Sequence, residues 1–226
     1  MSAQEWEAIW LTASLAGITT VILLVIGTPL AWWLSRHKTN AAALVEALVA
    51  LPLVLPPTVL GFYLLLMLAP DTALGRGWQA LTGTTLAFSF QALVIGSVIY
   101  SLPFVVQPLQ QAFSRVPAGL LEAGASLGAT PLDQFRSLVL PMTRRSFLVA
   151  AALGFAHTVG EFGVVLMIGG NIPGETRVLS IALYDYVETL QFAEAHRLAL
   201  GLVVFSLVTL FMLYRSAPDA RLGISR

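Results

Sequence analysis

Residues 8–34 read AIWLTASLAGITTVILLVIGTPLAWWL, a stretch that contains no charged side chain. About 20 predominantly apolar residues are enough to cross the roughly 30 Å hydrocarbon core of a bilayer as an α-helix. The stretch is longer than the hydrophobic region of a signal peptide, and no basic residue precedes it. It therefore predicts a membrane-spanning helix that is retained in the protein.

Four more apolar stretches of this kind follow along the chain, at residues 44–69, 85–107, 147–168 and 198–214. Hydrophobic residues make up 57% of the chain and charged residues 11%, whereas about a quarter of a soluble domain is charged. We therefore predict an all-α, polytopic integral membrane protein with about five transmembrane helices. Residues 1–226 are expected to form one transmembrane domain. The absence of cysteine excludes disulfide bonds and thiolate chemistry.

Lysine and arginine are distributed unequally between the two sides of the predicted domain. Cytoplasmic loops carry an excess of these residues, and one side holds Arg36, Lys38, Arg115, Arg136, Arg144, Arg145, Arg215, Arg221 and Arg226. Only Arg76, Arg177 and Arg197 fall on the other side. This distribution predicts a multi-pass protein of the cell inner membrane with a periplasmic N-terminus and a cytoplasmic C-terminus. The formal net charge is zero, which gives no reason to expect a nucleic acid as partner.

Prolines interrupt several of the predicted spans, at Pro29, Pro52, Pro56, Pro57, Pro103 and Pro108. Each proline removes a backbone donor and kinks or breaks a helix. In a bilayer the freed carbonyls must be satisfied by neighbouring helices or by a water-lined cavity. The breaks, above all LPLVLPP at residues 51–57, favour a protein with a pathway over a simple membrane anchor.

The longest cytoplasmic segment, residues 108–145, predicts two short helices. In the first, Leu120, Gly124 and Leu127 follow helical spacing. In the second, Thr130 can cap the helix with Asp133 three residues later, and an apolar stripe follows. Pro141 is expected to end this second helix before the next span.

The outer segment, residues 171–197, is too polar to span the membrane. It opens with turn residues, Asn171, Pro173 and Gly174. A helical apolar stripe follows and predicts a short helix packed on the outer face, formed by Leu179, Leu183, Tyr186, Val187 and Leu190.

His157 and Glu161 are the ionisable residues deep in the fourth span, spaced as i and i+4 on one predicted helical face. Ionisable groups are costly in hydrocarbon and usually face a cavity or a partner. Two interpretations stay open: a mutually satisfied pair that holds the bundle together, or residues that line a pathway. A metalloenzyme is disfavoured because the stretch lacks the His-Glu-x-x-His pattern, and we expect neither a metal site nor a catalytic residue.

The cytoplasmic sequence EAGASLGATPLDQFRSLVLP, residues 122–141, resembles the EAA loop of binding-protein-dependent ABC importer permeases. That loop reads E-A-A, three residues, Gly, nine residues and I-x-L-P. The matching positions are Glu122, Ala123, Gly128, Leu140 and Pro141, while Gly124 replaces the second alanine and Leu138 the isoleucine. The resemblance implies a type I ABC importer permease fold, with residues 108–145 as the segment that couples to an ATPase.

A second resemblance narrows the substrate. The sequence LPLVLPP and the sequence GEFGVVLMIGGNIPGETRVLSIALY, residues 160–184, are similar to the molybdate-type permeases and more distantly to the sulfate-type permeases. This implies import of molybdate, and of tungstate, with a sulfate or thiosulfate permease as the alternative. The candidate pathway or gate residues are Glu161, Phe162 and Gly163, which lie in the similar stretch, together with His157, which is a candidate because it is ionisable. Those of the outer loop are Asn171, Pro173, Gly174, Glu175 and Arg177.

The family implies several partners: a second copy of this chain, two cytoplasmic ATP-binding subunits that hold ATP and Mg, and a periplasmic oxyanion-binding protein, all at a lipid bilayer. A P-loop needs Gly-Lys-[Ser/Thr], and the only lysine, Lys38, follows His37. We therefore expect no cofactor and no ATP hydrolysis in this chain. An ion-coupled secondary transporter remains an alternative, although no inverted repeat is visible, and so does a membrane scaffold.

Overall fold

The computed structural model describes residues 2–216, and these residues form helices and loops without a β-strand. Four stretches among them are long and apolar enough to cross a membrane: residues 3–36, 90–114, 131–160 and 192–213. A fifth span is present if the bent pair at residues 40–53 and 57–68 is counted as one. The prediction of an all-α, polytopic membrane protein is therefore confirmed.

Three long helices form the centre of the bundle: α1 (Ala3–Arg36), α5 (Phe90–Ser114) and α8 (Leu140–Gly160). Small residues allow them to approach closely. A β-carbon built on Gly154 of α8 would lie 2.8 Å from Cγ2 of Val105 in α5, and one on Gly27 of α1 would lie 3.3 Å from Cγ1 of the same valine. Close backbone approach of this kind is how transmembrane helices pack without a hydrophobic driving force.

The predicted second span is not one straight helix. The chain forms α2 (Asn40–Ala50), a 3-10 turn, η1 (Leu51–Leu53), and α3 (Pro57–Leu68), and the two halves are bent by 109°. Pro52, Pro56 and Pro57 lack backbone N–H donors, so the α-helical ladder cannot continue through residues 51–57. By contrast, Pro29 lies inside α1, and Pro103 and Pro108 lie inside α5, without ending either helix.

The predicted fourth span is also broken. Helix α8 ends at Gly160, Glu161 is extended with φ −68° and ψ 135°, and a short helix, α9 (Gly163–Gly169), follows. The expectation that His157 and Glu161 lie on one face of a continuous helix is therefore wrong. Helix α9 packs against α3, so the second halves of the two broken spans lie together.

Pro141 does not end a helix, which corrects the prediction for the cytoplasmic segment. The chain runs from α7 (Pro131–Gln134) through a π-helical turn, η2 (Phe135–Val139), directly into α8. Pro141 follows this π-helical turn, and the helix continues through it into α8. The other predicted helix is present as α6 (Ala118–Ser126).

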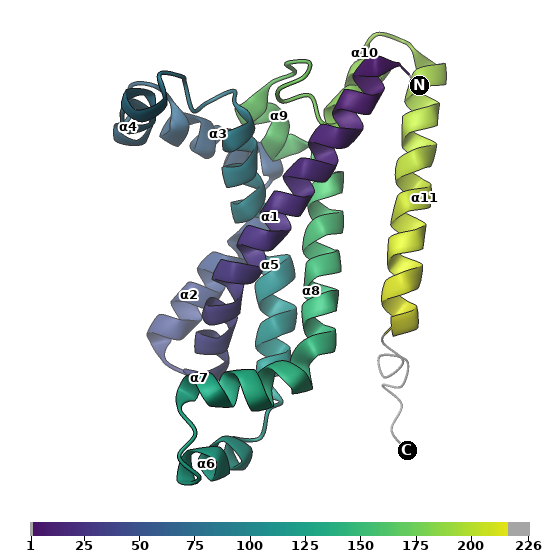
Figure 1. The fold of residues 1–226 in the computed structure, drawn as a ribbon. Helices are drawn as coiled ribbons and strands as arrows, with labels where there is room; N and C mark the ends of the chain where they lie inside the picture. Colours follow the sequence, from purple (N-terminus) through teal and green to yellow (C-terminus); the bar gives the residue numbers. More distant parts are fainter. Residues whose placement is uncertain (1, 217–226) are drawn as a thin grey trace.

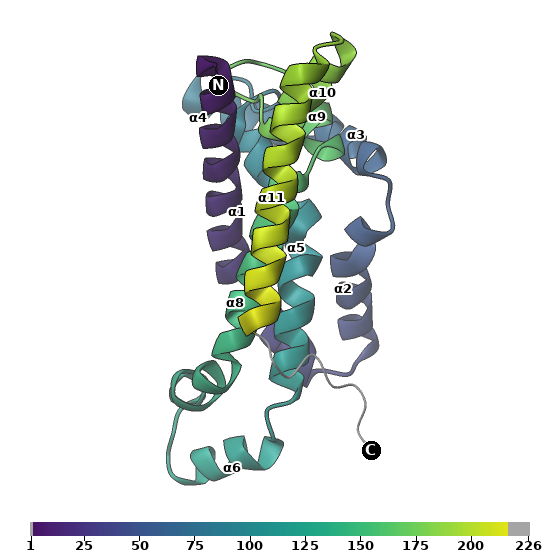
Figure 2. The same ribbon diagram turned by 90° about the vertical axis from the view of Figure 1, so that its right-hand side faces the viewer.

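Two short helices lie at the end of the bundle that was predicted to face outward. The predicted one is α10 (Leu179–Glu188), whose Leu179, Leu183 and Tyr186 pack against a cluster that includes Ala8 and Leu198. Val187 and Leu190 remain 45% and 72% exposed, so the stripe is shorter than predicted. The other, α4 (Ala73–Thr82), was not predicted and links the bent pair to α5. Both lie at the N-terminal end of α1, opposite α6 and α7 (Figures 1 and 2).

The last helix, α11 (Phe192–Ser216), begins earlier than predicted and stands beside the bundle (Figure 1). Only 6% of its apolar window is buried inside the chain. Its outer end is tied to α1 because Arg197 donates to Glu5, with 3.2 Å between Nη2 and Oε1. The predicted cytoplasmic residues Arg221 and Arg226 lie outside the described residues.

Candidate translocation pathway and coupling segment

Two adjoining pockets follow the broken spans. One, of about 380 Å³, is lined by residues 52–57 of the proline-rich break together with Tyr100, Phe104 and His157. The other, of about 540 Å³, is lined by Pro57, Thr58, Tyr100, Ala156, His157, Gly160, Glu161, Phe162 and Gly163. All four residues predicted for a pathway or gate therefore border one space. Thr58 and Tyr100 were missed, because nothing in their local pattern distinguishes them from lipid-facing residues.

His157 lies where the two pockets meet. Its Nδ1 is 2.9 Å from Oγ of Ser101 in α5, and that oxygen is 3.1 Å from Oγ1 of Thr158. The imidazole stacks on Phe104, with 3.9 Å between ring centroids, and lies 4.9 Å from the ring of Tyr100. The ring is thus held from α5 by one hydrogen bond and two aromatic contacts.

Glu161 does not pair with His157, which excludes the mutually satisfied pair. The glutamate is 3% exposed, and neither carboxylate oxygen has a hydrogen-bond partner among the described residues. Oγ of Ser97 in α5 is buried and also lacks a partner there. The backbone of Glu161 is held, since Ser180 of α10 donates its hydroxyl to the Glu161 carbonyl. The break is therefore fixed in place while its carboxyl group stays unpaired.

The segment predicted to be cytoplasmic, which contains α6 and α7, lies at the end of the bundle opposite the N-terminus of α1 (Figure 1). The predicted capping box is confirmed: Oγ1 of Thr130 accepts from the Asp133 amide at 3.2 Å, and Oδ2 of Asp133 accepts from the Thr130 amide at 3.1 Å. A β-carbon on Gly124 would lie 3.3 Å from Cδ1 of Leu138, so Gly124 is where the two helical pieces approach closely.

Residue 128 needs glycine for its backbone conformation rather than for close packing. Nothing lies within 4 Å of a β-carbon built there, so close approach does not require glycine. Its φ of +85° does, because L side chains rarely adopt that conformation. The left-handed residue lets the chain leave α6 and turn into α7, with the Gly128 amide donating to the Ala125 carbonyl.

Several residues of the EAA-like loop are exposed on the surface of the chain. Glu122 and Ala123 are exposed, and so is Pro141. Apolar side chains are exposed beside them, with Leu127 at 89%, Leu132 at 56%, Met142 at 56% and Leu140 at 39%. A group of exposed apolar side chains at a polar end of the molecule is typical of a protein-binding surface. We call these seven residues the loop surface.

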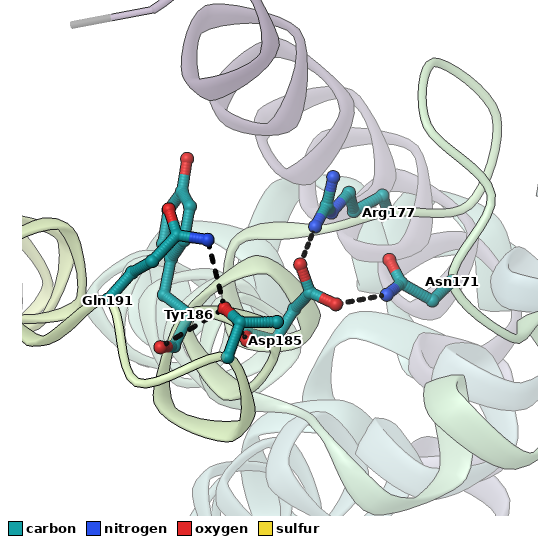
Figure 3. A network of polar contacts seen from close by, with 6 residues as sticks. Asn171, Arg177, Asp185, Tyr186 and Gln191 are labelled. Carbon is teal, nitrogen blue, oxygen red and sulfur yellow. Dashed lines mark hydrogen bonds and ion pairs between the residues drawn. The ribbon is translucent and has the colours of Figure 1, made fainter.

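The outer segment is held by a polar network (Figure 3). Arg177 pairs with Asp185 of α10, and Nδ2 of Asn171 donates to the other oxygen of Asp185 at 2.9 Å. The Arg177 side chain is 15% exposed, so its charge is already engaged within the chain. Thr176, which sequence reasoning missed, is fully buried and donates to the Gly169 carbonyl at 2.7 Å.

The turn within the outer segment carries the other predicted residues. Pro173, Gly174 and Glu175 are exposed, and Gly174 has a φ of +77°. The residues predicted for this loop thus divide into two groups: Asn171 and Arg177 fasten the segment to α10, whereas the three turn residues face the outside.

The chain is similar to known transport proteins over nearly its whole length. The family described as "Binding-protein-dependent transport system inner membrane component" matches residues 9–223. The molybdenum transport system permease protein ModB of Azotobacter vinelandii is 54% identical over 96% of each chain. The protein of that name in Escherichia coli K12 is 34% identical over 82% of this chain and 81% of its own length.

Solved structures show the same fold at low sequence identity. A bacterial alginate ABC transporter matches with a TM-score of 0.76, at 16% identity, over 96% of this chain and 79% of the matched chain. The MetNI methionine ABC transporter matches with a TM-score of 0.66, at 20% identity, over 96% of this chain and 99% of the other. By family match and fold alike, the chain belongs to the binding-protein-dependent transport system inner membrane components, the permease subunits of ABC importers.

Proposed function

We propose that the chain is the membrane-spanning subunit of an ATP-driven importer that carries molybdate, and with it tungstate, from the periplasm to the cytoplasm. The single observation that carries this proposal is the 54% identity, over 96% of both chains, to a molybdenum transport system permease protein. The aligned region covers 96% of this chain and so spans the pathway, the loop surface and the outer segment.

Sulfate is the competing substrate. A sulfate transport system permease protein of Synechococcus elongatus is 32% identical over 84% of this chain and 68% of its own length. The two molybdenum relatives described above are more similar, at 54% and 34% identity, and this chain covers more of their length, 96% and 81%, which favours molybdate. Both substrates are tetrahedral dianions, so the distinction has to be measured.

The pathway has few groups that could bind an anion tightly, which suits a transporter whose substrate is selected by another subunit. The five apolar stretches predicted from the sequence to cross the membrane, residues 8–34, 44–69, 85–107, 147–168 and 198–214, contain no lysine or arginine, so no fixed cation is expected to clamp the anion midway. The pockets offer an imidazole, the Thr58 hydroxyl and backbone groups of the two breaks. We infer that the membrane site is weak and that a periplasmic binding protein imposes the selectivity.

The transporter is proposed to contain two copies of this chain and two cytoplasmic subunits that bind ATP and Mg. The loop surface supports docking of the ATPase, because a group of exposed apolar side chains at a polar end of the molecule is typical of a protein-binding surface. Glu122, Ala123, Gly124, Gly128, Leu138, Leu140 and Pro141 are the residues proposed to transmit its movement. The exposed turn at residues 173–175 is proposed to face the binding protein.

The proposed orientation places the N-terminus in the periplasm. It is supported by the charge distribution and by the opposite positions of α10 and the loop surface along the bundle (Figure 2). A reporter fused after Arg226 is expected to be active only in its cytoplasmic form, and one fused before Trp6 only in its periplasmic form. Both ends on one side would contradict the proposal.

Reconstitution tests the function. The complex with its ATPase and binding protein, in proteoliposomes, is expected to accumulate molybdate and tungstate in an ATP-dependent, vanadate-sensitive manner, and sulfate much less. Uptake driven by an ion gradient without ATP would favour a secondary transporter. Preference for sulfate would support the alternative permease class.

A further inference from the structure

We infer that His157 offers the transported oxyanion a hydrogen bond only when its imidazole is protonated, so that import depends on a proton at this residue. The inference rests on the proposed function for the identity of the anion. The geometry behind it is the chain of hydroxyl groups that links His157 to the backbone of α8.

The direction of these hydrogen bonds follows from counting protons. Oγ1 of Thr158 lies 2.9 Å from the carbonyl oxygen of Gly154, which has no proton to give, so Thr158 donates. Thr158 has a single hydroxyl proton, and its oxygen must therefore accept from Ser101, 3.1 Å away. Ser101 has then used its own proton and accepts from Nδ1 of His157, 2.9 Å away.

The reversed order is less favourable. If Thr158 donated to Ser101 and Ser101 donated to His157, no proton would lie between Oγ1 of Thr158 and the Gly154 carbonyl. Two oxygen lone pairs would then face each other at 2.9 Å in a buried site, where an unmade hydrogen bond costs most. The arrangement that satisfies all three contacts places the proton of the neutral ring on Nδ1.

The other ring nitrogen, Nε2, is consequently unprotonated in the neutral ring. It makes no hydrogen bond with the described residues, and His157 borders both pockets. Two other titratable groups adjoin these pockets, the Tyr100 phenol from α5 and the Glu161 carboxyl group beyond α8. Residues 52–57, which approach from the proline-rich break, contribute no titratable side chain.

A tetrahedral dianion presents only acceptor oxygens. Facing the Nε2 lone pair, it would meet a second acceptor in a site of low dielectric, which is repulsive. Protonation of Nε2 turns the same atom into a charged donor, and a charge-assisted hydrogen bond becomes possible. Histidine can make this change because both ring nitrogens are donors in the protonated imidazole.

The tautomer can be measured without transport. The chain contains three histidines, so the His37→Gln, His196→Gln double variant leaves His157 as the only imidazole. Ring ¹⁵N chemical shifts of this variant in lipid nanodiscs are expected to show a proton on Nδ1 and an unprotonated Nε2 in the neutral state. Ser101→Ala should abolish this preference. Ser97→Ala, one turn earlier on α5 and without a hydrogen bond to His157, should leave it unchanged.

The pH dependence of ATP-driven molybdate uptake is the second measurement. In the reconstituted complex, uptake at subsaturating substrate is expected to fall about tenfold as the pH rises through the titration of the ring, the loss of one charge-assisted contact. His157→Gln should remove this dependence, because the amide does not titrate. His37→Gln, an exposed histidine outside the pockets, should retain it.

The two measurements distinguish the inference from the function on which it rests. A neutral ring protonated on Nε2, or a pH dependence that survives His157→Gln, would overturn the inference while leaving a molybdate importer intact. Absence of ATP-driven molybdate uptake at every pH would refute the proposed function, and with it the role of His157 as an anion contact.

Discussion

Gly163 lies directly against Pro57: a β-carbon built on the glycine would be 2.6 Å from Cβ of the proline. Pro57 begins the second half of one broken span and Gly163 begins the second half of the other. Their contact joins the two breaks and forms part of the wall of the larger pocket. The pathway geometry therefore depends on the absence of a side chain at residue 163.

The first prediction concerns this contact. Gly163→Ala is expected to lower stability by about 1–3 kcal/mol, because an added carbon overpacks a fixed backbone junction, and to reduce uptake. Gly160→Ala is the matched control, since nothing lies within 4 Å of a β-carbon at that position. Thermal unfolding of the purified protein and uptake by the complex measure both effects. If the two variants had the same stability and the same uptake, the contact between residue 163 and Pro57 would not be the constraint that we infer.

The second prediction concerns access to the pathway. Thr58 is exposed and borders the larger pocket, and the chain has no cysteine, so Thr58→Cys provides a single thiol. Gly163 itself is unsuitable for this probe because of its contact with Pro57. We expect the thiol to react with membrane-impermeant aqueous reagents in at least one transport state.

The control for this labelling is Val204→Cys on α11, where the side chain is 52% exposed on a helix that stands apart from the bundle. It should react with lipid-soluble maleimides rather than with impermeant reagents. A Thr58→Cys thiol that behaves like the control in every transport state would place the pocket against lipid.

The third prediction concerns the loop surface. The Glu122 side chain makes no hydrogen bond or ion pair within the described residues; only its backbone carbonyl accepts from Ser126, at 2.9 Å, so Glu122→Lys should leave folding and insertion unchanged. If the ATPase docks here, the reversed charge should uncouple ATP hydrolysis from uptake or release the ATPase. Co-purification and substrate-stimulated hydrolysis measure this, and normal values for both would argue against the coupling role.

Gly128→Asp is expected to have the same functional consequence with a modest cost in stability, about 1 kcal/mol, because residue 128 needs a positive φ. Gly119→Asp is the control for the added charge. Gly119 lies in the same segment, nothing lies within 4 Å of a β-carbon built there, and its φ is not positive. If coupling is lost only at residue 128, the shape of the turn is what matters.

The fourth prediction concerns the outer segment. Asp185 holds both Arg177 and Asn171, so Asp185→Ala should release residues 171–177 from α10. Faster hydrogen exchange of that segment and weaker stimulation by the binding protein are expected. Glu188→Ala is the control, because Glu188 accepts only from Tyr184 on the same helix. Unchanged exchange in Asp185→Ala would mean that Thr176 alone anchors the segment.

Local patterns were enough to predict much of this protein. Apolar length predicted the membrane-spanning stretches, since the bilayer requires about 20 apolar residues wherever a helix crosses it. The capping box of Thr130 and Asp133 was predictable because both partners lie within one turn. The EAA-like loop was recognisable for a similar reason, as its residues keep their spacing along the chain.

Only the tertiary structure showed which of the prolines interrupt a helix. Pro29, Pro103 and Pro108 lie within helices, whereas the chain bends by 109° at the break that contains Pro52, Pro56 and Pro57. Nothing in a single proline distinguishes these outcomes. The difference arises because neighbouring helices must satisfy each freed carbonyl.

The partners of His157 and Glu161 were likewise beyond sequence reasoning. Their spacing suggested a pair on one helix, but α8 ends at Gly160 and the Glu161 carboxylate makes no hydrogen bond with His157. His157 instead bonds Ser101, which is 56 residues away in the chain and adjacent only because α5 packs against α8. Sequence by itself determined which segments enter the membrane; packing between distant helices determined which side chains meet there, because such contacts depend on three-dimensional neighbours that no local period encodes.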